Sequence, residues 1–298
     1  MSESVGQMKN QNVEKNVELR IDYHFHPNLN KSELKAIEMA HKWWQTLQEV
    51  GVNVVLITEH IYKNPKRAYE IMKRTMPKEM VCFPGMEYLT KEGIDLILFS
   101  QSESLYEYQE LTPYNLTYEE AIIFIESHPD IHGFITHPYV PSKTGIIKNL
   151  GYEKFQYYLK RLGALEVVSV GGMQHVIKLL KALDNAQIIS KKLSIKQRFK
   201  VRSSMKVPEF DYHLHDLKFI AVGSDAHHFS ELGNYLAVSS PSNALSDIFN
   251  TIISSKEGKI HMNYHGHLEK HPHIGVLRSG VTVFKEYLMK QPFRMKNK

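Results

Sequence analysis

Runs of apolar, β-branched residues alternate with stretches of helical periodicity along most of the chain, and this alternation restricts the fold more than any other feature. Strands are predicted at residues 19–26, 52–58, 80–83, 94–100, 133–136, 164–170 and 219–222. Helices are predicted at residues 32–50, 65–76, 118–127, 152–162, 173–183 and 243–255. Strands that alternate with helices indicate a mainly parallel sheet, either open or closed into a barrel.

The composition is that of an ordinary globular chain, because 42% of the 298 residues are hydrophobic and 23% are charged. Residues 1–16 are polar and are predicted to form a disordered segment before a single domain over residues 17–298. The stretch 185–217 is long for a connection and is predicted to be an insertion. Its basic run fits a solvated surface better than a lid over a polyanionic substrate. A basic C-terminal extension is predicted after about residue 262.

The sequence also restricts the compartment in which the protein works. Its single cysteine, Cys82, excludes an internal disulfide and a multi-thiolate zinc site. The first twenty residues lack the apolar core of a signal peptide, and no apolar run approaches the roughly 18 residues that a membrane span needs. We therefore expect a cytoplasmic protein with no membrane partner. No pattern in the sequence indicates an oligomeric state.

Histidines and acidic residues recur where the predicted strands end. The first strand ends in the pair His24-x-His26, whose side chains share one face because strand side chains alternate with period two. The other strand ends carry Thr58-Glu59-His60, Pro84-Gly85-Met86-Glu87, Thr136-His137-Pro138 and Gly223-Ser224-Asp225-Ala226-His227. In parallel α/β folds the carboxyl ends of the strands form the functional face. The pattern therefore predicts one metal site at that face.

The candidate ligands are nitrogen and oxygen donors without sulfur, a set that suits zinc, manganese or iron. A carboxylate such as Glu87 or Asp225 can bridge two metal ions. Neighbouring ions lower the pKa of a bridging water and neutralise the oxygens of a phosphoryl group during in-line displacement. No serine or cysteine nucleophile motif is present. The residues thus favour metal-dependent hydrolysis of a phosphate ester.

In chain order, these motifs resemble those of the PHP superfamily, named for polymerase and histidinol phosphatase. The resemblance covers about residues 20–241, and its strongest elements are His24-x-His26 near the start and Gly223-Ser224-Asp225-Ala226-His227 near the end. It implies an α/β fold in the form of a distorted seven-stranded β/α (TIM-like) barrel. It also implies two to three divalent metal ions and a phosphoesterase activity in which a metal-bound hydroxide is the nucleophile.

The resemblance further implies which residues bind the ions. One ion would be held by His24, His26, Glu87 and Asp225, a second by His60 and His227, and a third by Glu87 with His137. The predicted catalytic residues are Asp225, His227, His60 and Glu87.

Three positions depart from the family pattern. Glu59 replaces the usual aspartate and is predicted to orient ligands. Glu33 is the only residue after the first histidine pair that could serve as the acidic or histidine ligand expected there, and Asp95 stands near the place of a common histidine. We include both as candidate metal ligands. These departures leave open an alternative function, a metal-binding module with an incomplete cluster that acts in binding or regulation.

The predicted partner is a small phosphomonoester or a nucleotide, whereas nucleic acid is less favoured. Candidate substrate-binding residues follow the motif-bearing strands, namely Lys63, Arg67, Lys143 and His228. Glu166 is predicted to pack in the barrel interior or to support a ligand. An amidohydrolase-type centre is disfavoured, because no lysine stands at a strand end where it could bridge metals.

Other histidine-rich and aromatic positions are interpreted as structural. The segment D-Y-H-L-H at residues 211–215 precedes a predicted strand, so it is expected on the opposite face from the metal site. Residues 265–273 contain H-x-E-x-H, which is not a metalloprotease order, and are predicted to form a surface connection. Trp43 and Trp44 are predicted to pack in the core.

Overall fold

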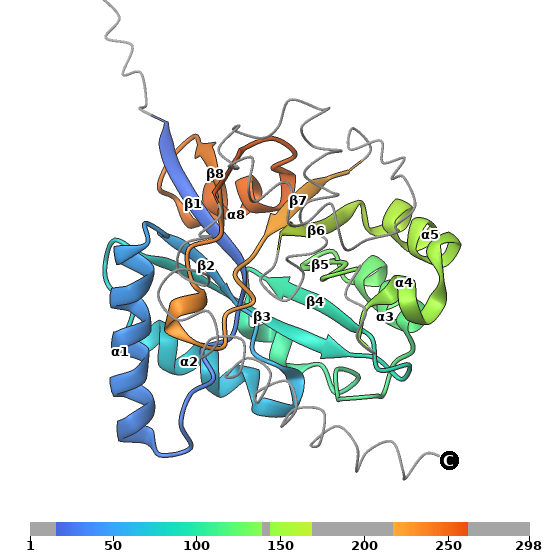
Figure 1. Ribbon diagram of the computed structural model, residues 1–298, viewed down its shortest axis with the longest axis horizontal. Helices are drawn as coiled ribbons and strands as arrows, with labels where there is room; N and C mark the ends of the chain where they lie inside the picture. The colour runs from blue at the N-terminus through green and yellow to red at the C-terminus, as the bar shows by residue number, and fades with distance from the viewer. Residues whose placement is uncertain (1–15, 139–143, 169–216, 262–298) are drawn as a thin grey trace, which may run out of the picture.

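The computed structural model describes residues 16–138, 144–168 and 217–261 (Figure 1). Its strands are β1 (Val17–Phe25), β2 (Val54–Ile57), β3 (Val81–Leu89), β4 (Asp95–Ser100), β5 (Ile131–Phe134), β6 (Ala164–Val168), β7 (Phe219–Val222), β8 (Tyr235–Ser240) and β9 (Lys259–His261). Its α-helices are α1 (Glu33–Glu49), α2 (Pro65–Arg74), α3 (Tyr118–Ser127), α4 (Ile146–Leu150), α5 (Tyr152–Leu162) and α8 (Leu245–Ser254). Short 3-10 helices are η1 (Ile61–Lys63), η2 (Glu103–Glu107) and η4 (Phe229–Glu231).

Seven of these strands form one curled sheet in the order β5-β4-β3-β2-β1-β8-β9, and β6 and β7 form a second, two-stranded sheet. In the larger sheet, β1–β2 and β2–β3 are parallel pairs. The pairs β3–β4, β4–β5, β1–β8 and β8–β9 are antiparallel. The expected mainly parallel sheet is therefore a mixed one.

The predicted closed seven-stranded β/α barrel is wrong. In the part of the chain that the structure describes, the larger sheet is an open half-barrel with β5 and β9 at its edges. Isolated bridges at Ile135–Leu165 and Phe25–Ala226, rather than a continuous ladder, join the two-stranded sheet to it. Closure of a β/α barrel needs strands that all pair in parallel around the ring. The antiparallel returns of β4 and β8 break that repeat.

Strand β3 continues past the point where the sequence predicts that it ends. Residues 81–84 pair with β2, and residues 85–89 pair with β4. At the change of partner, a Cβ atom on Gly85 would lie 3.1 Å from the carbonyl oxygen of Leu98. The hydroxyl of Tyr106 bonds both backbone groups of Gly85, each at 3.1 Å. Glycine therefore allows a close approach inside the strand, and Glu87 lies within β3.

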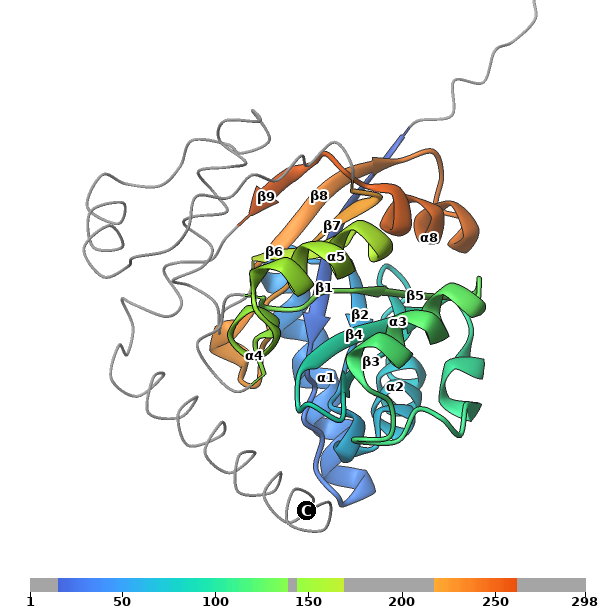
Figure 2. The ribbon, with the colours of Figure 1, turned by 90° about the vertical axis from the view of Figure 1, so that its right-hand side faces the viewer.

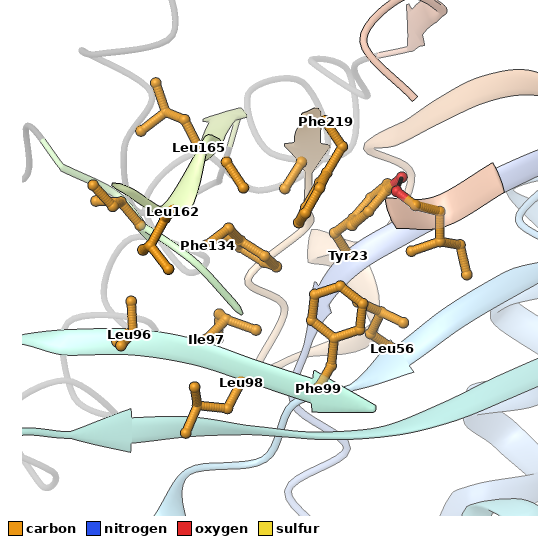
Figure 3. Close-up of a cluster of buried hydrophobic side chains, with 14 of the residues drawn as sticks. Tyr23, Leu56, Leu96, Ile97, Leu98, Phe99, Phe134, Leu162, Leu165 and Phe219 are labelled. Atoms are coloured by element: carbon orange, nitrogen blue, oxygen red, sulfur yellow. Dashed lines mark hydrogen bonds between the residues drawn. The ribbon is translucent and has the colours of Figure 1, made fainter. Parts of the chain in front are cut away.

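Helices cover the sheet on two sides (Figures 1 and 2). Helix α2 packs against β2 and β3 and contacts α1, whereas α3 packs against β5 and α5, and α8 against β7 and β8. The interior of the curled sheet is filled by aromatic rings from different strands, and Figure 3 shows Tyr23, Phe99, Phe134 and Phe219 pointing toward one another. The rings of Tyr23 and Phe219 are stacked, with centroids 6.1 Å apart.

A second apolar cluster lies between the sheet and helices α1 and α2. Trp43 and Trp44 are buried in it beside Phe25, as predicted for core residues. The indole nitrogen of Trp43 donates to the carbonyl oxygen of Pro27 at 2.7 Å, and that of Trp44 to Met72 at 3.0 Å. Helix α1 is thereby fixed to the segment that leaves β1.

Several predictions concern residues outside the described ranges. These are the N-terminal segment, nearly all of the insertion at 185–217, the helix at 173–183, the segment 211–215, the C-terminal extension with residues 265–273, and Lys143. Among the described residues, no helix is both long and apolar enough to cross a membrane.

Candidate metal centre

Three groups of side chains bring possible metal ligands together, each with ligand atoms within 4.8 Å of one another. The groups are His26, His60 and His227; His24, His26 and Glu87; and Glu87, Asp95 and His137. His26 belongs to the first two groups and Glu87 to the last two. The groups therefore form one continuous row of nitrogen and oxygen donors, all buried except half-buried His227, which we call the metal centre.

The histidine pair of β1 faces this centre because the strand is irregular there. The register between β1 and β2 shifts between Asp22 and Phe25. Tyr23 packs in the cluster inside the curled sheet, whereas Phe25, two residues later, packs in the cluster between the sheet and helices α1 and α2. Such an irregularity re-aims side chains next to functional sites. It turns both His24 and His26 toward the other ligands.

The loop after β7 is attached directly to the end of β1. The amide of Asp225 donates to the carbonyl oxygen of His24 at 2.7 Å, and the amide of His26 donates to Ala226 at 3.2 Å. A Cβ atom on Gly223 would lie 2.3 Å from the Cβ of His24, so only glycine allows this approach. Two segments separated by some two hundred residues are thus held in one site.

Asp22 reinforces the same attachment and was given no role by the sequence. Its Oδ1 accepts from the amides of His24 at 3.1 Å and Ser224 at 2.9 Å. Burial raises the pKa of Asp22 to about 7, although the bonds from Ser224 and His24 lower it. The signal that could have revealed it is the acid two residues before His24, at the end of the strand where polar residues are buried.

Glu166 of β6 lies behind His24 and sets its orientation. Its Oε1 lies 2.8 Å from His24 Nδ1, while its Oε2 accepts from the Thr136 hydroxyl at 2.8 Å and from the His137 amide at 2.7 Å. Burial opposes protonation of His24, but Glu166 and Asp225 raise its pKa to about 10. A carboxylate behind a histidine fixes which ring nitrogen faces a metal. This geometry corresponds to the supporting role expected for Glu166.

Three imidazoles converge at one end of the centre. The ring of His26 stacks on that of His60, with centroids 4.2 Å apart, and on that of His227 at 4.5 Å. The Nε2 atoms of His60 and His227 are 3.0 Å apart. Burial and the two neighbouring imidazoles lower the pKa of His26. A neutral imidazole offers a lone pair, which is the form that binds a metal.

Glu87 connects the two ends of the centre through its two carboxylate oxygens. Its Oε1 lies 3.1 Å from His137 Nε2, and its Oε2 contacts His60 Nδ1. Burial opposes ionisation, but His60 and His137 hold the pKa of Glu87 well below its ordinary value. Oε2 is buried and has no hydrogen bond of acceptable geometry in the described part of the chain. An ionised oxygen placed in this way suits a cation.

Asp95 and Asp225 supply further oxygens. Asp95 Oδ2 lies 3.9 Å from His137 Nε2, and Asp225 Oδ1 lies 3.3 Å from His26 Nε2. His137 and Asp225 have backbone φ angles of 26° and 49°, in the left-handed region. Non-glycine residues in this region store strain and occur preferentially at functional sites.

Glu59 holds the segment that follows His26. Its Oε2 accepts from the Asn28 amide at 2.6 Å, and its Oε1 accepts from the His60 amide at 3.1 Å. Oε1 also lies 3.8 Å from His26 Nδ1. Despite burial, His26 and Lys63 keep the pKa of Glu59 at about 2. The side chain thus contacts both candidate ligands, and its role in orienting them stays a prediction.

The structure does not bring Glu33 to the metal centre. This exposed carboxylate pairs with Arg67 at 3.4 Å and with Arg74. Arg67 also donates to the carbonyl oxygens of Asn30 and Lys31, so it binds the loop after β1.

The other candidate substrate residues lie near the rim. Lys63 Nζ is 3.4 Å from Asn28 Oδ1 and 6.0 Å from the ring centroid of Tyr62, whose ring stacks on His60. His228 Nδ1 lies 3.0 Å from the Ser230 hydroxyl.

The donor set fits divalent cations. Neighbouring histidines lower the pKa of Glu87 and Asp225, and neighbouring carboxylates raise the pKa of buried His137 to about 9 and that of His24 to about 10. Divalent ions can replace the imidazole protons and bind the same lone pairs. The residues that would hold them are those of the three groups together with Asp225.

Comparisons with known proteins support the fold. No protein-family model matches the chain, and no curated protein matches it. Among solved structures, PsfC from Pseudomonas syringae PB-5123 is 15% identical, with a TM-score of 0.54 over 91% of this chain and 99% of that one. A two-domain protein from Bacteroides vulgatus ATCC 8482 containing a predicted PHP-like metal-dependent phosphoesterase is 13% identical, with a TM-score of 0.50 over 86% of this chain and 68% of that one. At identities this low, the similarity shows a shared fold alone.

Proposed function

We propose that the protein is a metal-dependent phosphoesterase that hydrolyses a small phosphomonoester or a nucleotide. One observation carries this proposal: His26 and Glu87 link three groups of possible metal ligands into one row. The fold shared with a protein that contains a predicted PHP-like metal-dependent phosphoesterase supports the reaction class. Divalent ions bound in the row would polarise a phosphoryl group and activate water for attack on phosphorus.

Residues behind the metal centre would orient its ligands, and other residues would face the substrate. Glu166 and Glu59 hold His24 and the segment after His26 from behind, so the ligand nitrogens do not need to reorganise when an ion binds. Asp225, His60, His227 and Glu87 are the residues that we assign to the reacting face. Hydrolysis adds water across the phosphorus–oxygen ester bond and yields inorganic phosphate and an alcohol.

Lys63 is the residue that we assign to the substrate phosphate. It lies beside Tyr62 and Asn28, next to His60 at the rim of the centre. A lysine ammonium binds phosphate as a compact point charge. We expect Lys63→Ala to raise KM more than it lowers kcat, whereas Lys78→Ala, which removes an exposed lysine beyond helix α2, leaves both unchanged.

The test of the function is reconstitution. Chelator-stripped protein is reloaded with Mn²⁺ or Zn²⁺ and assayed on small phosphomonoesters, nucleotides and short oligonucleotides. We expect turnover that is lost in Asp225→Asn and in His60→Ala and retained in Asp130→Asn, which changes an exposed acid. If no phosphate ester is turned over faster by the wild type than by Asp225→Asn, the proposal fails.

The alternative is a metal-binding module without hydrolysis. The observation that favours it is the segment after His26, where the amide of Asn28 bonds Glu59 and Glu33 pairs with arginines instead of joining the centre. Metal analysis separates the two functions. Fewer than two equivalents per chain under saturating metal, together with no turnover, would support the module.

A further inference from the structure

The two ends of the metal centre differ in their donor atoms. At one end, His26, His60 and His227 offer nitrogen only. At the other, Glu87 and Asp95 offer carboxylate oxygens and His137 a single imidazole. All six side chains except that of His227 are buried, so bulk water competes little with the protein as ligand. Donor type is therefore the main chemical difference between the two ends.

Strand topology explains why the second end is rich in oxygen. In the antiparallel pair β3–β4, Glu87 lies opposite Ile97, and Leu89 lies opposite Asp95. Asp95 is thus the diagonal neighbour of Glu87 on the same face of the sheet, within reach of a shared ion. Because β4 runs antiparallel to β3, the start of β4 lies at the edge where β3 ends. The fold itself therefore adds a second carboxylate beside Glu87.

Donor type selects between ions. Imidazole nitrogen suits zinc, copper, iron and nickel, whereas carboxylate oxygen suits manganese, magnesium and calcium. Zinc binds more tightly than manganese at either kind of site, but the difference is largest where all donors are nitrogen. A mixture of the two ions will therefore fill the ends of the centre unequally.

We propose that the centre is heterometallic, with Zn²⁺ at the end formed by His26, His60 and His227 and a harder ion of the Mn²⁺ type at the end formed by Glu87, Asp95 and His137. The inference rests on the metal centre of the proposed function but not on its hydrolytic activity. Asp95 is the residue that determines which ion binds at this end. Glu87 is shared with the middle group, and His137 is a nitrogen donor.

The experiment measures binding rather than turnover. Full-length metal-free protein receives one equivalent of Zn²⁺ and is then titrated with Mn²⁺, and free Mn²⁺ is followed by electron paramagnetic resonance. We expect at least one Mn²⁺ to bind while the zinc is retained, as measured by elemental analysis after gel filtration. Binding of no Mn²⁺, or release of the zinc by Mn²⁺, would overturn the inference.

Variants locate the two ions. Loss of an outer partner of a metal ligand lowers affinity by about 10–100-fold, so loss of a direct ligand in Asp95→Asn is expected to weaken Mn²⁺ binding by at least about tenfold. The same variant should leave Zn²⁺ affinity unchanged. In contrast, His227→Ala should weaken Zn²⁺ binding and leave Mn²⁺ affinity unchanged. Asp130→Asn is the matched control, because Asp130 is exposed. Unchanged Mn²⁺ affinity in Asp95→Asn contradicts the assignment, and the wild-type titration tests it even if a variant does not fold.

The results also separate this inference from the proposed function. Selective filling by zinc and manganese without turnover of any phosphate ester would reject the phosphoesterase and leave the heterometallic centre standing. Turnover by a protein that holds zinc at both ends, with no manganese bound, would reject the heterometallic centre and support the phosphoesterase.

Discussion

Glu166 Oε1 lies 2.8 Å from Nδ1 of His24, inside the half-barrel, where both side chains are buried. The contact leaves His24 Nε2 facing His26, so Glu166, which lies outside the three ligand groups, sets the orientation of a residue that belongs to one of them. The interaction spans 142 residues of sequence. Gln at this position would keep the shape and lose the charge.

We expect Glu166→Gln to weaken metal binding by about 10–100-fold, the range typical for loss of a partner behind a metal-ligating histidine. Isothermal titration with Zn²⁺ measures the change. Glu257→Gln is the control, since Glu257 is exposed. Equal affinity in Glu166→Gln and wild type would show that Glu166 does not act through His24.

Gly223 should tolerate no side chain. A Cβ atom there would lie 2.3 Å from the Cβ of His24 and 2.9 Å from its backbone nitrogen. We expect Gly223→Ala to destabilise the protein by about 1–3 kcal/mol, as overpacking does, and to weaken metal binding as well. Urea unfolding and metal titration measure the two effects.

The control for this change is Gly151→Ala. Gly151 has a φ of 83°, but a Cβ atom added to it would meet no heavy atom within 4 Å, so the substitution carries backbone strain without a clash. It should destabilise the fold and leave metal affinity intact. If both alanine variants affect metal binding equally, the clash with His24 is not the cause.

The strand-end pattern anticipated most of the residues that meet at the centre, because β7 ends at the predicted residue and β1, β2 and β5 end within about two residues of theirs. Strands β8 and β9 were missed. Their pairing with β1 and with each other is long-range and antiparallel, and no local period encodes it. The closed barrel was implied by the resemblance to the PHP superfamily, and the antiparallel pairs of β4 and β8 depart from it.

Two acidic positions that the resemblance named as candidate ligands, Asp95 and Glu33, differ in outcome for reasons that the strand-end pattern does not contain. Asp95 stands at the start of a strand, where a strand-end rule does not look, and it reaches the centre because β4 runs antiparallel to β3. Glu33 stands at a plausible distance from His26 in sequence, but it begins helix α1 and lies on its exposed side beside Arg67 and Arg74. The direction of β4 brings Asp95 to the centre, and the orientation of helix α1 keeps Glu33 away from it. Both depend on tertiary packing.

Metal binding should strengthen as pH rises. Without metal, the pKa of His24 is about 10 and that of His137 about 9, so both imidazoles carry protons at neutral pH. An ion that binds either nitrogen must displace its proton, and affinity then rises about tenfold per pH unit for each proton displaced, until pH exceeds the raised pKa. Competition with a chelator of known protonation between about pH 6.5 and 8.5 measures the slope. A flat profile would contradict displacement of either proton.

Cys82 should be inert in the folded protein. Burial raises the pKa of this thiol to about 12, and the thiolate is the reactive form. We expect slow modification by Ellman's reagent at pH 8 in buffer and fast modification in concentrated urea. Because the chain has one cysteine, the signal is unambiguous. Rapid reaction of the folded protein would show that the cluster between the sheet and helices α1 and α2 opens.

The two adjacent tryptophans offer a matched test of how helix α1 supports the metal centre. Trp43 donates to Pro27, the residue after His26, at 2.7 Å, whereas Trp44 donates to Met72 on helix α2 at 3.0 Å. Phe at either position keeps an aromatic ring and removes the indole N–H, which in Trp44 also donates to the Thr75 hydroxyl at 3.2 Å, so each variant should lose at least about 0.5–1.5 kcal/mol of stability. Of the two variants, only Trp43→Phe should also weaken metal binding, because the bond of Trp43 restrains the segment carrying His26 and that of Trp44 does not. Equal metal affinity in the two variants would show that the attachment of α1 supports the fold and not the site.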